Sequence, residues 1–190
     1  MIPIDKMVVG AAPADFEFAR TGQGAVGQWV VVEDSSEPGQ RAIEQSNTDR
    51  TDYRFPLAIY QPARVKNVEV TLRFKPVAGR VDQAGGIAVR LISPDDYYLV
   101  RANALEDNVR FYRIVKGRRQ QLATANVKVA SGIWHTLGIR AENDRFTVSF
   151  NGKPVHSTTD KTFPAAGHVA LWTKSDSVTR FDQISIRVLP

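Results

Sequence analysis

The chain has 190 residues, of which 43% are hydrophobic and 24% charged, and it contains no cysteine. This length and composition are typical of one globular domain with its own apolar core, so we predict a single domain over residues 1–190. The absence of cysteine excludes disulfide frameworks and thiolate metal sites. No stretch approaches the roughly 20 apolar residues of a membrane-spanning helix, and no signal peptide is visible at the start.

The formal net charge of +5 raises the question of a nucleic-acid partner. Basic residues are scattered, and their one dense group, residues 116–119, surrounds a glycine between two extended runs. A nucleic-acid surface needs a continuous basic stripe, commonly with stacking aromatics. We therefore expect residues 116–119 to be a solvated hairpin tip and expect no nucleic-acid partner.

Apolar and polar residues alternate with a period of two along most of the chain. Clear examples are residues 67–75, 87–91 and 145–151. This period predicts β-strands with one buried face. Between the strands lie turn-forming residues rich in Gly, Asn, Asp and Pro, which predict antiparallel hairpins. These turn signals fall at residues 93–96, 106–108, 116–117 and 151–152.

Roughly a dozen such strands are too many for one open sheet and favour two sheets packed face to face. We predict an all-β fold, a two-sheet antiparallel jelly-roll sandwich with at most one short helix. Residues 1–26 are expected to pack on the sandwich or extend it. The phase of the alternation breaks at residues 180–183, which a β-bulge would explain before the last strand.

The alternation also predicts which polar side chains point away from the core. If Val100 and Phe111 face inward, their neighbours on the middle strands face outward, and these are rich in aromatic and arginine side chains. An aromatic ring can stack on a sugar ring while Arg and Asn bind its hydroxyls. We predict a ligand-binding face made of Arg90, Arg101, Asn103, Tyr112, Trp172 and Lys174. The alternative is that a loop covers Trp172 and that the arginines pair with acidic residues.

The sequence does not assign catalytic residues. Glycanases of this architecture place carboxylates at alternating positions of one strand, whereas Glu33–Asp34 and Glu106–Asp107 are adjacent pairs whose side chains leave opposite faces of a strand. No serine lies in a nucleophile elbow. These features argue against classical glycanase or serine hydrolase chemistry.

The sequence gives no local metal motif either. The three histidines, His135, His156 and His168, are too far apart for one. We therefore expect no metal and no cofactor. The alternative left open is calcium bound by Asp82, Asp176 and Asp182.

Several segments, taken in order, resemble a known family. Residues 82–90 and 96–108 resemble the "GG-hydrophobic, then NYY-x-x-R" hairpin of laminin G-like and related bacterial domains. Residues 132–135 and 150–153 resemble the "G-x-W-H" and "F-N-G" elements of these domains, and residues 171–182 resemble their closing strand pair. From about residue 27 to its end the chain is similar to concanavalin A-like lectin and glucanase domains, and most similar to bacterial 3-keto-disaccharide hydrolase-like domains. The resemblance implies a concanavalin A-like sandwich, export to the periplasm or the extracellular space, and the binding or processing of sugars.

Three functions remain open. The first is an exported carbohydrate-binding domain, with a carbohydrate or another small polar ligand as partner and a monomeric chain. The second is a hydrolase acting on an oxidised (3-keto) glycoside, for which the available titratable groups are Asp82, Glu106, His135 and Asp176. The third is a protein-binding adhesion or scaffold domain.

Overall fold

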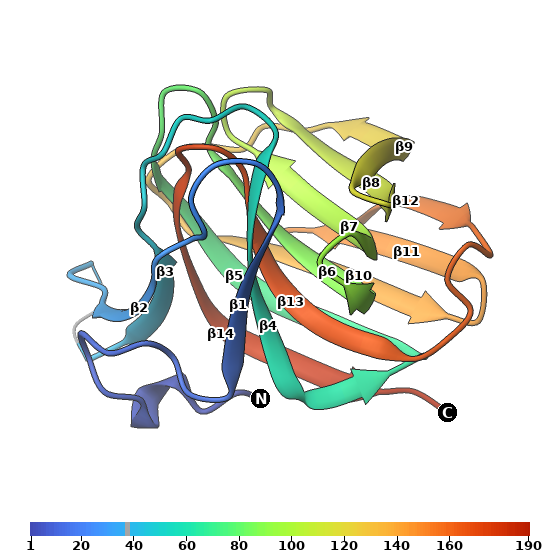
Figure 1. The fold of residues 1–190 in the computed structure, drawn as a ribbon, viewed down its shortest axis with the longest axis horizontal. Helices are drawn as coiled ribbons and strands as arrows, with labels where there is room; N and C mark the ends of the chain where they lie inside the picture. The colour runs from blue at the N-terminus through green and yellow to red at the C-terminus, as the bar shows by residue number, and fades with distance from the viewer. Residues whose placement is uncertain (37–38) are drawn as a thin grey trace.

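Two antiparallel β-sheets packed face to face make up the molecule, as the computed structural model shows for residues 1–36 and 39–190 (Figure 1). Sheet A has the strand order β1 (Phe16–Gly22), β4 (Arg54–Val65), β13 (Gly167–Thr173), β6 (Ala84–Ser93), β7 (Asp96–Asn103), β8 (Asn108–Val115) and β9 (Arg118–Asn126). Sheet B has the order β12 (Lys153–Thr159), β11 (Arg145–Phe150), β10 (His135–Glu142), β5 (Val68–Ala78), β14 (Val178–Val188), β3 (Arg41–Gln45) and β2 (Trp29–Glu33). The predicted two-sheet jelly-roll sandwich is confirmed.

Helical structure in the described residues is limited to one 3-10 turn, η1 (Ile4–Lys6). In the same part of the chain, no helix has the length and hydrophobicity needed to cross a membrane. The predicted turns at residues 93–96, 116–117 and 151–152 each join two consecutive antiparallel strands. The predicted break before the last strand is also present, since the pairing of β14 with β5 shifts register between Asp182 and Ser185.

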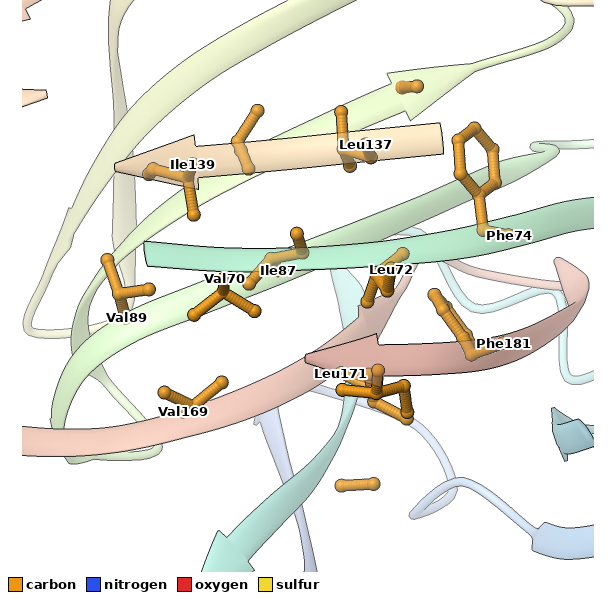
Figure 2. Close-up of a cluster of buried hydrophobic side chains, with 14 of the residues drawn as sticks. Val70, Leu72, Phe74, Ile87, Val89, Leu137, Ile139, Val169, Leu171 and Phe181 are labelled. Carbon is orange, nitrogen blue, oxygen red and sulfur yellow. The ribbon is translucent and has the colours of Figure 1, made fainter. Parts of the chain in front are cut away.

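The main core lies between the sheets and is formed by the inward side chains that the alternation predicted (Figure 2). Val70, Leu72 and Phe74 of β5 face Ile87 and Val89 of β6 across the sandwich, and none of them is more than 1% exposed. Burying an aliphatic side chain of this size contributes about 1.5–3 kcal/mol to folding. This core is what fixes the two sheets to each other.

A second apolar cluster lies on the opposite face of sheet A, which we call its outer face. Its members are Phe55, Leu57, Ile59, Ala84, Ala88, Leu91, Tyr97, Leu99, Tyr112, Ile114, Ala170 and Trp172. The rings of Phe55 and Trp172 are stacked, with centroids 5.3 Å apart. Sheet A is therefore apolar on both faces over much of its area, although antiparallel sheets commonly leave one face to solvent.

This cluster is covered by contacts between segments of sheet A that are far apart in the sequence. Thr21 at the end of β1 donates a hydrogen bond to the carbonyl of Pro94 in the β6–β7 turn. The Tyr53 hydroxyl donates to the carbonyl of Gly117 in the β8–β9 turn at 3.1 Å and accepts from the amide of Arg119. The Arg119 guanidinium lies 4.6 Å from the centre of the Phe55 ring. These contacts join the two ends of the sheet and shield the cluster from water.

The N-terminal residues contact both sheets. Ile2, Ile4 and Met7 belong to the main core, and the amide of Ile2 donates to the carbonyl of Ile184 in β14. Further along, Phe16–Gly22 forms the edge strand of sheet A and pairs with β4. Residues 1–22 thus both pack against the sandwich and extend it.

Candidate functional site

Five of the six predicted ligand-binding residues come from the outer-face side of sheet A. Trp172, Gly86, Arg101 and Arg110 lie directly opposite one another on β13, β6, β7 and β8, and therefore share one face. Asn103 and Tyr112 follow at the alternate positions of β7 and β8, and Lys174 comes directly after β13. The predicted alternation is confirmed for these residues of β7, β8 and β13.

The sixth residue, Arg90, does not lie on this face, and its predicted outward direction is wrong. Arg90 has a φ of +50°, and the pairing of β6 with β7 shifts register after Val89. Its guanidinium donates to the carbonyls of Lys66, Phe163 and Asn143 and lies 5.1 Å from the centre of the Phe146 ring, which belongs to the main core. Burial lowers the pKa of Arg90. This arginine ties loops together at the far end of the sandwich.

The same irregularity redirects the next residue. The alternation over residues 87–91 predicts that Leu91 faces the main core with Ile87 and Val89, but Leu91 belongs to the outer-face cluster. The pattern Ile-x-Val-x-Leu looks unbroken in the sequence, and so it hid the bulge.

Trp172 is not exposed for stacking on a ligand. Its relative exposure is 0%, and its ring is stacked on Phe55 within the outer-face cluster. Tyr112 is also buried, at 5% exposure. The alternative considered for the sequence, a covered tryptophan, describes the structure. Lys174, by contrast, is partly exposed at the end of the sheet, where 16% of its side chain is accessible.

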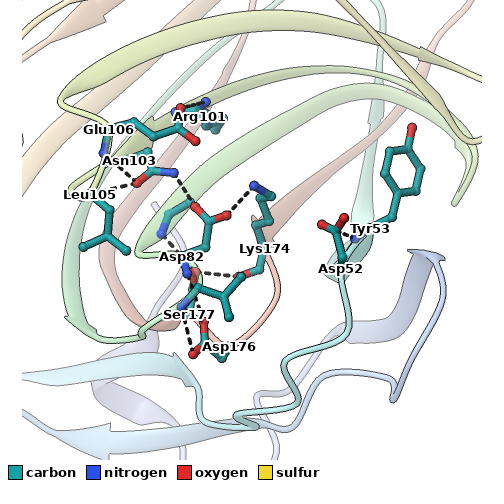
Figure 3. Close-up of polar contacts among 12 residues, drawn as sticks. Asp52, Tyr53, Asp82, Arg101, Asn103, Leu105, Glu106, Lys174, Asp176 and Ser177 are labelled. Carbon is teal, nitrogen blue, oxygen red and sulfur yellow. Dashed lines mark hydrogen bonds and ion pairs between the residues drawn. The ribbon is translucent and has the colours of Figure 1, made fainter.

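A polar group that we call the Asp82 cluster lies at this end of sheet A (Figure 3). It consists of Asp82, Arg101, Asn103, Glu106, Asn108 and Lys174. Asp82 accepts a hydrogen bond from the Asn103 side-chain amide and forms an ion pair with Lys174. Asp82 is 2% exposed, and the Lys174 side chain is 16% exposed. The carboxylate is therefore buried but fully paired, as a buried charge must be.

Glu106 occupies the solvent side of the cluster. Its Oε2 accepts from Arg101 Nη2 at 2.8 Å and from Asn108 Nδ2 at 3.2 Å, and it forms an ion pair with Arg110 Nη1 at 3.2 Å. The Glu106 side chain is 35% exposed. Burial alone would raise its pKa, but the charge of Arg101 and these hydrogen bonds hold the pKa of Glu106 below its usual value. Glu106 therefore stays ionised at neutral pH.

The loop beneath the cluster is held by Asp176 and Ser177. The Asp176 carboxylate accepts from the backbone amides of Arg80 and Asp82 at 2.8 and 3.0 Å, and these bonds lower its pKa despite burial. Ser177 Oγ accepts from the amide of Ala84 at 3.0 Å. Gly79 makes this loop possible, because its φ is +148° and a Cβ there would lie 1.9 Å from the Asp82 carbonyl oxygen. Contacts of the Asp82 backbone, its amide with Asp176 and its carbonyl with Gly79, thus fix the position of this residue.

Tyr53 is a candidate residue that the sequence analysis missed. It is 36% exposed and packs edge-on against Phe55, with the two ring centroids 4.8 Å apart. Its φ of +56° is uncommon for an aromatic residue. Tyr53 lies in the loop before β4, where no alternation operates, so the period-two pattern could not identify it. It is an exposed aromatic ring on the outer-face side of the molecule.

Three of the four titratable groups considered for catalysis meet at this end: Asp82, Glu106 and Asp176. His135 does not join them. It lies in sheet B with its ring stacked on Phe150 at 5.2 Å, its Nε2 donates to the Ala130 carbonyl, and its Nδ1 accepts from Asn151. Since the pKa values of Glu106 and Asp176 are both lowered, these two groups are hydrogen-bond acceptors rather than proton donors at neutral pH.

The residues considered for calcium are each bonded to donors of the protein. Asp82 and Asp176 are held as described above, and Asp182 accepts from Arg73 and Gln40. Across residues 1–36 and 39–190, no group of three or more His, Asp or Glu side chains is arranged to hold a metal ion.

The fold is shared with several solved structures. The carbohydrate-binding module CBM66 from Bacillus subtilis superimposes with a TM-score of 0.69 at 18% identity, over 90% of this chain and 94% of the module. A Bacillus subtilis protein of unknown function with a galectin-like fold gives 0.61 at 9% identity, over 90% of this chain and 89% of its own. A carbohydrate esterase of the Shiga toxin-encoding bacteriophage phi24B gives 0.58 at 16% identity, over 91% and 90% of the two chains. At these identities the similarity establishes the fold.

Sequence comparison with curated proteins gives no match. By contrast, residues 20–187 match the family described as the 3-keto-alpha-glucoside-1,2-lyase-like domain. That match covers β1 to β14 almost completely and includes every residue of the Asp82 cluster. The chain therefore belongs to the 3-keto-alpha-glucoside-1,2-lyase-like domain family.

Proposed function

We propose that the chain is a carbohydrate-binding domain and that the sugar binds at the rim of the Asp82 cluster. The observation that carries this proposal is the fixing of Glu106, a one-third exposed carboxylate, by two arginines and an asparagine. Lys174 and Arg110 add partly exposed donors beside it. A rigid arrangement of acceptors and donors binds sugar hydroxyls with little loss of conformational entropy.

Two further features support a sugar as ligand. The exposed Tyr53 ring offers an apolar surface on which the C–H face of a sugar can stack. CBM66, named as a carbohydrate-binding module, supports the proposal through its shared fold.

The test is a glycan panel probed with the unmodified chain and with two matched variants. Arg110→Met removes a cation that pairs with Glu106 at the rim, whereas Arg113→Met removes one of equal exposure, 33% against 34%, on the same strand. Arg113 pairs with Asp160, away from the cluster. We expect Arg110→Met to weaken glycan binding about tenfold, the effect of losing one charged hydrogen bond, and Arg113→Met to leave it unchanged.

Thermal unfolding of both variants separates loss of binding from loss of folding. Binding that is absent throughout the panel, or equal for both variants while both remain folded, would refute the proposal.

A second candidate function is elimination on a 3-keto-glucoside, which the family match favours. Removing a proton next to a keto group needs a base, and the enolate oxygen that forms needs a cation to stabilise it. Glu106 is an ionised carboxylate, and Arg101 and Lys174 are cations of the same cluster. Incubation with 3-keto-glucosides should release the leaving group from the unmodified chain and not from Glu106→Gln. No product from several 3-keto-glucosides would argue against this activity and leave sugar binding in place.

Export of the chain follows from the family resemblance and is part of the same proposal. Fractionation of the producing cells should place the protein in the periplasm or the medium. Recovery from the cytosol alone would contradict it.

A further inference from the structure

A hollow of about 240 Å³ lies on the outer face of sheet A, at the end of β6 and β13 that is far from the Asp82 cluster. Its walls come from β1, β4, β6, β13 and the Ser93–Pro94 turn. Drug-sized sites have volumes of about 300–1,000 Å³, so this hollow has room for one small ring. Neither the sequence pattern nor the Asp82 cluster accounts for it.

Two adjacent β-bulges form the hollow. On β6, the bulge at Arg90 turns Leu91 to the outer face. On β13, the pairing with both neighbours shifts register just after His168, and His168 lies directly opposite Leu91 on one side and Arg64 on the other. β-Bulges re-aim side chains and are over-represented beside binding sites. Here they bring a histidine and an arginine to the edge of an apolar floor.

The floor and rim differ in character. Ala19, Ile59 and Leu91 form the floor and are part of the outer-face cluster or pack against it. Glu17 and Arg64 stand at the rim, and within the described chain neither side chain has a hydrogen bond or an ion pair. Most carboxylates and guanidinium groups near the Asp82 cluster are paired, so two free and opposite charges at one hollow stand out.

His168 adds a third polar group with a defined direction. Its Nδ1 lies 3.2 Å from the carbonyl oxygen of Tyr60. A carbonyl oxygen can only accept, so Nδ1 carries the hydrogen and Nε2 of the neutral ring is left as an acceptor. The rim therefore offers a carboxylate acceptor, an imidazole acceptor and a guanidinium donor above an apolar floor.

We propose that this hollow is a second sugar-binding site, separate from the Asp82 cluster, that holds one neutral hexose ring. A hydroxyl both donates and accepts, which suits a rim that presents both kinds of group. The opposite charges of Glu17 and Arg64 leave the rim without a net sign, which disfavours a charged ligand. The C–H face of the ring covers Ile59 and Leu91.

The test is a titration of the full chain with glucose, galactose, mannose and fructose, followed by NMR of the histidine rings. We expect the His168 signals to shift and saturate with at least one hexose. The His135 and His156 signals should stay in place, because both rings lie elsewhere, His135 in sheet B and His156 against Phe111.

Two rim variants, Glu17→Gln and Arg64→Met, should each lower the hexose affinity about tenfold, as measured by the concentration at which the His168 shift is half saturated. The matched control Glu33→Gln changes an exposed carboxylate on β2 of the other sheet and should leave the titration unchanged. Melting temperatures verify that the variants are folded.

The result is independent of the proposed function, because Arg110→Met should leave the His168 titration intact. No saturable His168 shift with any of the four hexoses would overturn the second site. So would a shift that both folded rim variants retain.

Discussion

The outer faces of the two sheets differ although both come from alternating sequences. In sheet B the alternation separates core from solvent, and β5 and β11 change between buried and half-buried or exposed side chains at each residue over most of their length. Charged residues occupy its outer positions, as in the pairs Arg140–Glu142 and Arg187–Glu69. In sheet A, β7 is buried at every residue after its first.

This difference shows what alternation can and cannot reveal. The period of two assigns side chains to one face or the other, but the chemistry of the outer residues decides whether that face is solvated. The outer positions of sheet A include Phe55, Leu57, Leu99 and Ile114. Around Leu57 and Leu99 the neighbouring residues are also apolar, which produces continuous apolar runs such as residues 55–59 and 97–100. Such runs indicate strands buried on both faces.

The strongest way to test the difference is to truncate one outer side chain on each sheet. Trp172→Ala should lower the free energy of unfolding by about 3–5 kcal/mol, because it leaves a large cavity in the outer-face cluster. Thr147→Ala, at an outer position of β11, should change it by less than about 0.5 kcal/mol. Urea unfolding measures both. Equal and small effects would show that the outer face of sheet A is not a second core.

A second comparison concerns the charged pairs. Asp82→Asn should destabilise the fold by about 2 kcal/mol, because Lys174 and Asn103 lose the charge of a carboxylate that is 2% exposed. Asp107→Asn breaks an exposed pair with Lys128, and we expect no measurable change. Denaturant midpoints of the two variants provide the test. A stable Asp82→Asn protein would mean that the Asp82 cluster does not hold its loops.

The smallest expected effect is on the pH dependence of stability, and it comes from His156 at the edge of the main core. Both ring nitrogens of His156 are buried and have no hydrogen-bond partner among the described residues. Burial lowers the pKa of His156 below its usual 6.5. The unfolded chain then binds a proton more readily than the folded chain, so stability is lost as the pH falls through about 6.5.

Replacing this residue should remove that loss. The melting temperature of His156→Leu should fall less than that of the unmodified chain between about pH 7.5 and about pH 5. Contributions from the carboxylates are common to both proteins and cancel in the comparison. Parallel curves would mean that the His156 ring is open to water.

Most of the fold could be predicted from the sequence because hairpin turns and alternation are local signals. Arg101, Asn103 and Lys174 were placed on one side of sheet A for the same reason. The burial of Trp172 could not be predicted, since it depends on the contacts of Thr21 and Tyr53 with distant turns. The predicted direction of the Arg90 side chain was wrong because a bulge turns side chains to the other face without changing the spacing of apolar residues in the sequence. Contacts between residues far apart in the chain thus decide which predicted face remains accessible.

The strand order has a consequence for the synthesis of the chain. β13 lies between β4 and β6 in sheet A, and β14 lies between β5 and β3 in sheet B, as Figure 1 shows for both red strands. β13 and β14 follow the other twelve strands in the sequence, and each is an interior strand of its sheet. Each sheet stays divided into two parts, with unpaired strand edges, until residues 167–188 have left the ribosome. Long-range pairing of this kind slows folding in general, and we expect the unpaired edges of the nascent chain to be open to aggregation until β13 and β14 are in place.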